Sequence, residues 1–389
     1  MTGAGMQRTI EKVFFALLRF EINGTEICEE TKNLIAPELL PALYQLSKRH
    51  DLAHLIGDAL AKLGKLEDSE IAKRFLQERN MAVYRYEQIQ YELEQICETL
   101  KEAKIIFIPL KGSVIRAYYP EPWMRTSCDI DVLVKEEDLE RVIELLKEKL
   151  QYRFDSIAKH DAHLYAESGV HLELHYNLGD CVGEKDEILS KPFDFLLSSN
   201  DSQKTFSPEF FYLYHIGHAV RHFTLGGCGI RPFLDLWILK EKYCFDEEKL
   251  LAMLKENGWI SFAFAACGLA NAWFGSGTYN QTLRDIEQYL LYAGMYGDMK
   301  NRVAVQEKQS GSKFAYVWKR IFLSRKELMY QYPVLQKKPI LHPFYTIKRW
   351  FHLLGRKKRK TAFLELKETM KGDETRKQKI QNLFENLGI

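Results

Sequence analysis

The segment IIFIPLKGSVIRAYYPEPWMRTSCDIDVLV, residues 105–134, decides the fold that this sequence predicts. It begins with an apolar run of β type, 105–108, which ends at a Pro-Leu-Lys-Gly-Ser sequence. A short helical segment and a proline-punctuated loop, 120–127, follow, and a second strand then carries Asp129 and Asp131. Because successive side chains of a strand point to opposite faces, the two aspartates project together while the apolar residues between and after them point into the core.

Two adjacent carboxylates predict a metal site, because two like charges repel each other unless a cation lies between them. Oxygen ligands of this kind suit Mg²⁺ or Mn²⁺, although an Asp-x-Asp pair also occurs at solvent-facing strand ends without a metal. The Gly112-Ser113 pair at a helix start predicts a phosphate site, since free N–H groups and the positive end of the helix dipole attract anions. Lys111 and Arg125 flank this site as phosphate ligands or as ordinary surface cations.

Together these residues resemble the nucleotidyltransferase superfamily of DNA polymerase β type. The similarity to its large bacterial branch of nucleotidyltransferase family proteins extends over residues 100–240 and rests on Leu110-Lys111-Gly112, Tyr119-Pro120, Arg125 and Asp129-Ile130-Asp131. The gap between Gly-Ser and Asp-x-Asp is longer than in the minimal members, and loop 120–127 would accommodate the difference. The resemblance implies an α+β fold, in which a small mixed sheet forms the core and helical regions precede and follow it.

The residues after the Asp-x-Asp strand predict the rest of such a sheet. Residues 136–150 repeat apolar side chains at helix spacing, with acids near the start and lysines near the end, so we expect a helix that closes a β-α-β unit. Three extended segments follow at 152–157, 163–167 and 170–176. Ser168-Gly169 separates the last two, as in a hairpin.

The third extended segment places His171, Glu173 and His175 on the face opposite its buried Val and Leu residues. The superfamily resemblance implies that Glu173 is the third metal carboxylate, so that Asp129, Asp131 and Glu173 would be both metal ligands and catalytic residues. A zinc ion bound by the two histidines and Glu173 is the rival hypothesis, but it leaves the Asp pair and the Gly-Ser sequence unexplained. Without zinc, His171 and His175 would line the cleft or form hydrogen bonds with the acids.

A histidine-bearing helix follows the predicted sheet. Ser207-Pro208-Glu209 is a good helix start, and three histidines then lie on one helix face at 215, 218 and 222. They are either ligands or a half-buried polar face packed against the sheet. The bacterial branch commonly has such a helix followed by an Arg and an Asp, and the resemblance therefore implies His215, Arg231 and Asp235 as further site candidates.

Composition limits the partners and the location. The 55 Lys+Arg residues balance 53 Asp+Glu residues, so no overall field indicates nucleic acid. The seven cysteines are scattered, without a Cys-x-x-Cys pair, which argues against a disulfide scaffold and, with an N-terminus unlike a signal peptide, predicts a cytoplasmic protein. The uncharged stretch 257–283 is interrupted and too short to span a bilayer, so we expect a buried helix and no stable membrane insertion.

We expect four regions in the 389 residues: a helical region over 1–100, a nucleotidyltransferase core over 101–205, a helical domain over 206–300, and a C-terminal helical region over 301–389. The last contains a basic block, 348–360, before a predicted final helix, 361–387. This block is either a solvated linker or a dock for nucleic acid or anionic lipid. Nucleic acid is expected as a partner only through this block.

The predicted function is metal-dependent transfer of a nucleoside monophosphate from a nucleoside triphosphate such as ATP to an unknown hydroxyl acceptor, with release of pyrophosphate. The three carboxylates would hold two Mg²⁺ ions about 3.5 to 4 Å apart, one activating the acceptor and one neutralising the triphosphate. The Gly112-Ser113 backbone, Lys111 and Arg125 would stabilise charge on the phosphates. A non-catalytic nucleotide- or RNA-binding protein of the same fold and a zinc-dependent hydrolase are the alternatives.

Overall fold

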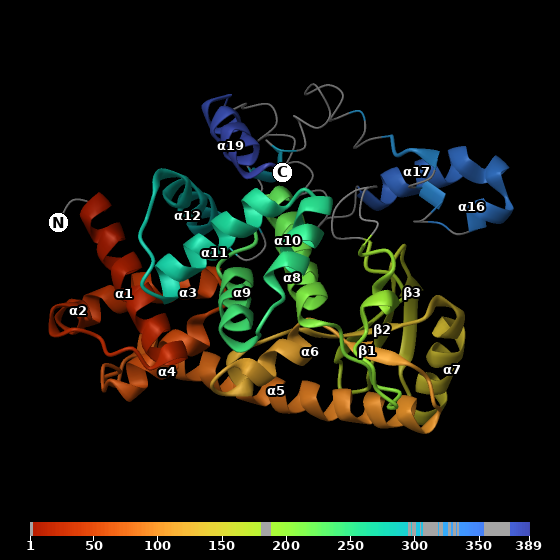
Figure 1. Ribbon diagram of the computed structural model, residues 1–389, viewed down its shortest axis with the longest axis horizontal. Helices are drawn as coiled ribbons and strands as arrows, with labels where there is room; N and C mark the ends of the chain where they lie inside the picture. Colours follow the sequence, from red (N-terminus) through yellow and green to blue (C-terminus); the bar gives the residue numbers. More distant parts are fainter. Residues whose placement is uncertain are drawn as a thin grey trace.

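A five-stranded mixed sheet lies between helical regions from both ends of the chain (Figure 1). The computed structural model describes residues 3–179, 188–294, 334–353 and 374–389, together with positions 297, 301–303, 305, 318, 322–325, 328, 329, 332. This architecture confirms the predicted α+β class.

The strand order in the sheet is β1-β2-β5-β4-β3. β2 pairs parallel with β5, and the other neighbours pair antiparallel. Gly169 adopts a φ of +84° in the predicted β4–β5 hairpin, a conformation that favours glycine. The strands are β1 (Phe107–Pro109), β2 (Asp129–Val134), β3 (Arg153–Ile157), β4 (Asp161–Tyr165) and β5 (His171–His175).

Two features of the sheet differ from the sequence-based expectation. β1 begins at Phe107 and not at Ile105, because the Ile105 N–H still donates to Leu100 at the end of the preceding helix (3.0 Å). The expected β-α-β unit is split: α7 (Leu139–Leu150) leads from β2 to β3, which lies parallel to β2 at the far edge. β5 and β4 lie between them, so β5 is the parallel neighbour of β2.

One face of the sheet packs on two helices. α5 (Glu70–Glu102) is 33 residues long, begins at an N-cap Ser69 that accepts a hydrogen bond from the Ala72 N–H, and runs along the lower side of the sheet in Figure 1. The buried cluster on this side takes alternate residues from the strands and apolar residues from α5 and α7. It includes Ile96, Leu100, Ile130, Val132, Val142, Leu146, Leu172 and Leu174. Alternation therefore directs the intervening polar residues of β2 and β5 to the other face.

The helices before and after the sheet share a second core. α8 begins at the predicted N-cap Ser207, whose hydroxyl accepts the Phe210 N–H, with Pro208 in the first turn. In this core the rings of Phe15 and Trp273 stack at 5.0 Å. The contributing helices include α1 (Gly3–Asn23), α2 (Glu29–Leu34), α3 (Leu40–Arg49), α4 (Ala53–Lys62), α8 (Pro208–Thr224), α9 (Arg231–Lys242), α10 (Glu247–Glu256), α11 (Ile260–Phe274), α12 (Gln281–Ala293) and α19 (Glu374–Leu387).

The apolar stretch near residue 260 forms the buried helix α11, as expected. Across the described part of the chain, none of the helices combines the length and the apolar character needed to cross a membrane. The domain boundaries at 100, 205 and 300 stay predictions. The remaining short elements are α6 (Gly112–Ile115), α16 (Val334–Lys337) and the 3₁₀ helices η1 (Pro37–Leu39), η2 (Arg116–Tyr118), η3 (Pro122–Met124), η4 (Glu136–Asp138), η5 (Pro192–Phe195) and η6 (Pro339–Leu341).

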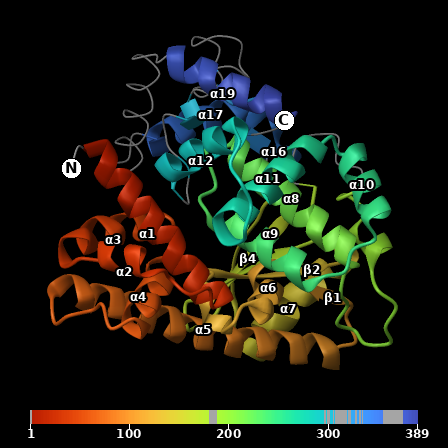
Figure 2. The ribbon, with the colours of Figure 1, turned by 60° about the vertical axis from the view of Figure 1, so that its left-hand side comes forward.

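The C-terminal elements α17 (His342–Leu353) and α19 are drawn in blue in Figure 2, where α19 lies beside α12. The predicted final helix is described from Glu374 onward, while positions 361–373 lie outside the described residues. Of the basic block, the structure describes 348–353, at the end of α17, and the predictions for 354–360 fall outside the described residues. Ile380, Leu383 and Leu387 of α19 are buried in the second core.

Candidate functional site

The parallel pairing of β2 and β5 brings two of the predicted carboxylates, Asp131 and Glu173, together. Asp129 lies on the same face, but among the described residues it belongs to no group of three metal-ligand atoms within 4.8 Å of one another. Asp131 is the register partner of Glu173, and Asp129 is the partner of His171. Ligand atoms of Asp131, Glu173 and His175 all lie within 4.8 Å of one another. We call Asp129, Asp131 and Glu173 the carboxylate cluster. A one-residue slip of β5 would turn Glu173 into the apolar core, so the register that builds this cluster is strongly favoured.

Asp131 is the most tightly held member of the carboxylate cluster. Only 4% of its surface is exposed, and its Oδ1 accepts a hydrogen bond from Lys111 Nζ at 2.8 Å and lies 2.8 Å from His175 Nε2. Burial alone would raise the pKa of Asp131, but the Lys111 charge and the His175 contact outweigh it and hold this pKa far below its usual value. Asp131 is therefore a carboxylate at neutral pH.

The pKa values of Asp129 and Glu173 are shifted in opposite directions. Burial and the negative charges of Asp131 and Glu173 raise the pKa of Asp129 to about 6. Glu173 lies 3.6 Å from His175, and this interaction is the main cause of its lowered pKa. Repulsion within the cluster is the kind of unfavourable interaction that a bound divalent cation relieves, so the donor set fits such an ion.

Lys111 reaches Asp131 from a backbone conformation that residues with side chains rarely adopt. Its φ is +45° and its ψ −122°, at the turn between β1 and α6. Such a conformation costs about 1–3 kcal/mol, and outliers of this kind concentrate at functional sites. The Leu110 N–H next to it donates to the Asp131 carbonyl at 2.9 Å, so the turn and β2 are fixed to each other.

The Gly-Ser turn is built by close backbone approach. A Cβ at Gly112 would lie 3.3 Å from the Ser127 Cβ, so a larger residue would push the turn away from the loop before β2. The buried Arg116 joins the same parts, donating to the Gly112 carbonyl at 2.8 Å and to Ser127 Oγ at 2.7 Å. α6 has only four residues, so its dipole contributes less to phosphate attraction than the sequence-based argument assumed. The Ser113 Oγ is buried and has no hydrogen-bond partner within the described residues.

Arg125 and Asp235 form a buried ion pair. Arg125 Nε and Nη2 donate to the two Asp235 oxygens at 2.8 and 2.9 Å, and the Tyr119 hydroxyl donates to Asp235 Oδ1 at 2.7 Å. Arg231 pairs with Asp51 and donates to the Thr126 carbonyl at 3.2 Å. These contacts fix loop 120–127 to α9 and to the segment before α4. The nucleotide contact of Arg125 and the place of Arg231 and Asp235 in the site stay predictions.

The histidine face of α8 lies near the carboxylate cluster. Burial and the positive charge of Lys111 lower the pKa of His218 well below its usual value, and the rings of His218 and His222 lie 4.4 Å apart. His215, in contrast, is buried within the second core: its Nδ1 lies 2.8 Å from the Phe211 carbonyl, and burial lowers its pKa to about 4. His215 is therefore neutral, and its predicted role at the site remains untested.

The three residues of the predicted zinc site, His171, Glu173 and His175, do not form one group of ligands. His175 and Glu173 belong to a group with Asp131, whereas His171 and Glu173 belong to a group with His163. Among the described residues no group joins His171, Glu173 and His175. His163 was not among the predicted site residues, although the alternation of Asp161, His163 and Tyr165 was a usable sequence signal for a polar face.

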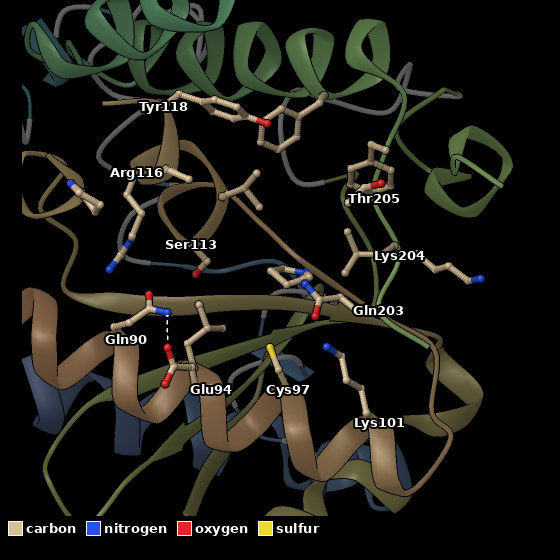
Figure 3. Close-up of a pocket in the computed structure, with 18 of the residues that line it drawn as sticks. Gln90, Glu94, Cys97, Lys101, Ser113, Arg116, Tyr118, Gln203, Lys204 and Thr205 are labelled. Atoms are coloured by element: carbon tan, nitrogen blue, oxygen red, sulfur yellow. Dashed lines mark hydrogen bonds between the residues drawn. The ribbon is translucent and has the colours of Figure 1, made fainter. Parts of the chain in front are cut away.

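A cavity of about 600 Å³ lies between α5 and α6 (Figure 3). Ser113 points into it from α6, and Gln90, Glu94, Cys97 and Lys101 line it from α5. The cavity is of the size that accommodates small organic ligands, and its lining shares Ser113 and Arg116 with the Gly-Ser turn and its buried support.

A mixed sheet with a carboxylate cluster beside a Lys-Gly-Ser turn is the arrangement expected of an enzyme that transfers nucleotidyl groups. The family model described as uncharacterised nucleotidyltransferase matches residues 38–275, more than half of the chain. The chain therefore belongs to this nucleotidyltransferase family, which supports a transferase acting on a nucleotide. No curated protein and no solved structure gives a significant match.

Proposed function

We propose that the protein transfers a nucleoside monophosphate from a nucleoside triphosphate to a hydroxyl-bearing acceptor and releases pyrophosphate, in the manner of the DNA polymerase β-type superfamily. The observation that carries this proposal is the register of β2 and β5, which pairs Asp131 with Glu173 and leaves Asp129 on the same strand face. The strained Lys111 beside Asp131 supports the same location, because it places a cation where triphosphate charge would accumulate.

The carboxylate cluster would hold Mg²⁺ or Mn²⁺. Its oxygens are the ligands these ions prefer, and the pKa of Asp129 is raised by burial and by the negative charges of Asp131 and Glu173, which a divalent cation would offset. When bound, such an ion supplies Lewis-acid stabilisation of phosphate charge and increases the acidity of a coordinated hydroxyl. His175 supports the cluster, because its contact with Asp131 holds that carboxylate in place.

Residues of the chain would accept the proton of the acceptor and stabilise the phosphate charge during the transfer. The acceptor oxygen forms a bond to the α-phosphorus, the bond from that phosphorus to the bridging oxygen breaks, and pyrophosphate leaves with that oxygen. The acceptor proton passes to Glu173, which we place closest to the attacking hydroxyl. Lys111 and the Gly112-Ser113 backbone would stabilise the charge that develops on the phosphates.

The test follows the transferred group. The protein is incubated with Mg²⁺ and ATP, GTP, CTP or UTP labelled at the α-phosphate, with small-molecule and macromolecular fractions of a cell extract as acceptors. We expect label transfer by the wild type that Asp131→Asn abolishes and that the exposed-site control Asp155→Asn retains. Transfer by the Asp131→Asn variant at the wild-type rate, or transfer to no fraction at all, would contradict the proposal.

A further inference from the structure

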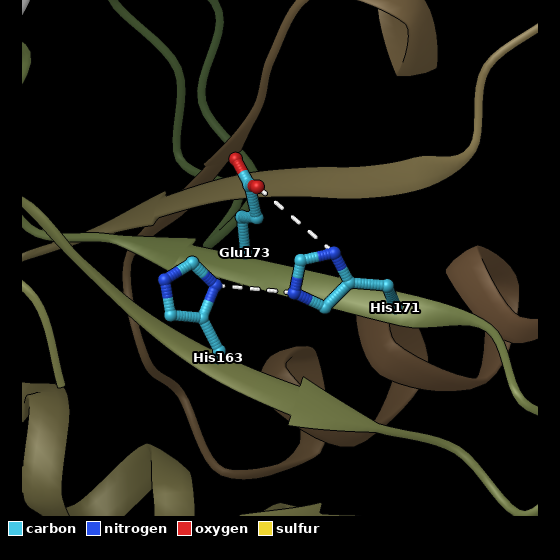
Figure 4. A group of neighbouring side chains, drawn as sticks. All are labelled: His163, His171 and Glu173. Atoms are coloured by element: carbon cyan, nitrogen blue, oxygen red, sulfur yellow. Dashed lines mark hydrogen bonds and ion pairs between the residues drawn. The ribbon is translucent and has the colours of Figure 1, made fainter. Parts of the chain in front are cut away.

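Two histidines extend the polar face of the sheet beyond the carboxylate cluster. β4 pairs antiparallel with β5, and His163 is the register partner of Glu173. His171 precedes Glu173 by two residues on β5 and therefore lies on the same face. Figure 4 shows His171 between the other two side chains: its Nε2 faces His163 and its Nδ1 faces Glu173. Ligands from one strand at positions i and i+2, with a third directly across on the neighbouring strand, suit a metal ion seated on a sheet.

The distances between the ligand atoms support this arrangement. His163 Nδ1 lies 3.1 Å from His171 Nε2, and one ligand atom from each of His163, His171 and Glu173 lies within 4.8 Å of the other two. A tetrahedral ion with metal–nitrogen bonds of about 2.0–2.1 Å separates two nitrogen ligands by about 3.3 Å. The two imidazole nitrogens are therefore already close to the separation that such an ion requires. Glu173 Oε1 lies 3.9 Å from His171 Nδ1, the other ring nitrogen, so the Glu173 side chain has to rotate toward Nε2 to become the third ligand.

Neighbouring side chains hold both rings in this orientation. His163 Nε2 lies 3.2 Å from Asp161 Oδ1, within ion-pair distance but without the geometry of a hydrogen bond, and His163 Nδ1 faces His171. A carboxylate beside the second nitrogen of a histidine is the usual support of a metal-binding imidazole. The His171 ring stacks on Tyr165 at 4.7 Å with an angle of 18° between the rings. A hydrogen bond between the two histidines would by itself explain their contact. It would not explain why Asp161 and Glu173 also lie beside the two rings.

The exposure of the three side chains and the types of their ligand atoms indicate the class of metal ion. The side chains of His163, His171 and Glu173 are 25%, 22% and 22% exposed, so an ion can enter from solvent. Two nitrogens and one oxygen favour Zn²⁺, Co²⁺ or Ni²⁺ over Mg²⁺, which prefers oxygen ligands. Three protein ligands leave a fourth position for water or a substrate atom, as in catalytic zinc sites.

We propose that His163, His171 and Glu173 form a transition-metal site of the zinc class, separate from the Mg²⁺ or Mn²⁺ site proposed at the carboxylate cluster. The two sites share Glu173, so an ion at the histidine site would compete for this carboxylate with the Mg²⁺ or Mn²⁺ site. Binding at the histidine site does not depend on nucleotide transfer, so each proposal can fail without the other.

The probe is Co²⁺, whose visible absorption reports a tetrahedral site, followed by displacement with Zn²⁺ in calorimetry. The full-length protein is first treated with a chelator. We expect one equivalent of Co²⁺ with tetrahedral absorption in the wild type, loss of that absorption in His163→Gln and His171→Gln, and affinity about 10- to 100-fold weaker in Asp161→Asn. His160→Ala, in the adjoining turn, is the matched control and retains binding.

Circular dichroism and thermal melting establish that each variant is folded, and the glutamine substitutions preserve side-chain length and polarity. Asp131→Asn should retain the Co²⁺ absorption even where it abolishes metal-dependent nucleotide binding, which separates the two proposals. Absence of a tetrahedral Co²⁺ spectrum in the wild type, or an unchanged spectrum in both folded histidine variants, would overturn the proposed site.

Discussion

Asp131 and Glu173 are direct register partners on two parallel strands, although α7, β3 and β4 separate them in the sequence. Their spacing is set by backbone hydrogen bonds between β2 and β5 and not by a flexible loop. A pair of carboxylates fixed in this way can present a constant arrangement of oxygen ligands, as a metal-dependent transferase requires.

Glu173 offers a test that separates binding from chemistry. Glu173→Gln should preserve the fold and most triphosphate binding, because Asp129 and Asp131 remain, yet reduce transfer by about 10²- to 10⁴-fold, the usual contribution of a proton acceptor. Transfer rates of labelled nucleotide, measured beside calorimetric affinity for ATP, check this prediction. Glu167→Gln, an exposed glutamate next to the β4–β5 turn, is the control. A Glu173→Gln variant with wild-type transfer would exclude the proposed role.

The raised pKa of Asp129 predicts a pH dependence of metal-dependent nucleotide binding. Burial and the charges of Asp131 and Glu173 raise this pKa to about 6, while Lys111 and Arg125 act in the opposite direction. Only the deprotonated carboxylate binds a metal, so affinity should fall by up to about tenfold per pH unit below pH 6 and be constant above about pH 7.

Nucleotide phosphates also titrate in this range, so the comparison is with Asp129→Asn. Calorimetry at several pH values should show the additional loss of affinity in the wild type and not in this variant. Identical pH profiles for the two proteins would mean that Asp129 does not control binding.

Much of the site was predictable because it depends on local alternation. The period-two pattern of β2 and β5 placed Asp129 with Asp131, and Glu173 with His171, on the correct faces. Non-local pairing was not predictable in this way. The sequence contains no local signal that Lys111 adopts a positive φ or that Arg125 pairs with Asp235 on α9, and it did not show that β3 lies at the far edge of the sheet.

The Arg125–Asp235 pair should matter for stability. Asp235 is 4% exposed and Arg125 donates to both of its oxygens, so Asp235→Ala leaves a buried guanidinium unpaired. We expect a loss of about 3–5 kcal/mol in the free energy of unfolding. Denaturant titration compared with Glu241→Gln, an exposed change on the same helix, measures it. A loss below 1 kcal/mol, on the scale of exposed pairs, would show that the pair is not structural.

The basic block should be dispensable for nucleotide binding, since it is remote in sequence from the Gly-Ser turn. Truncation before Lys348 is an unsuitable test, because it removes α19, whose Leu383 and Leu387 are buried in the second core. Replacing the five consecutive basic residues 356–360 by glutamine or serine keeps α19. We expect unchanged ATP affinity in calorimetry, and a folded variant that no longer binds ATP would refute this prediction.

Calorimetric titration with a non-hydrolysable ATP analogue would show whether the carboxylate cluster binds a triphosphate through a divalent metal. The wild type should bind in the presence of Mg²⁺ or Mn²⁺ and lose most of its affinity in a chelator, whereas Asp131→Asn should bind weakly under both conditions and Asp155→Asn should match the wild type. Equal wild-type affinity with and without metal, or an Asp131→Asn variant that binds as the wild type does, would contradict metal-dependent binding at the carboxylate cluster.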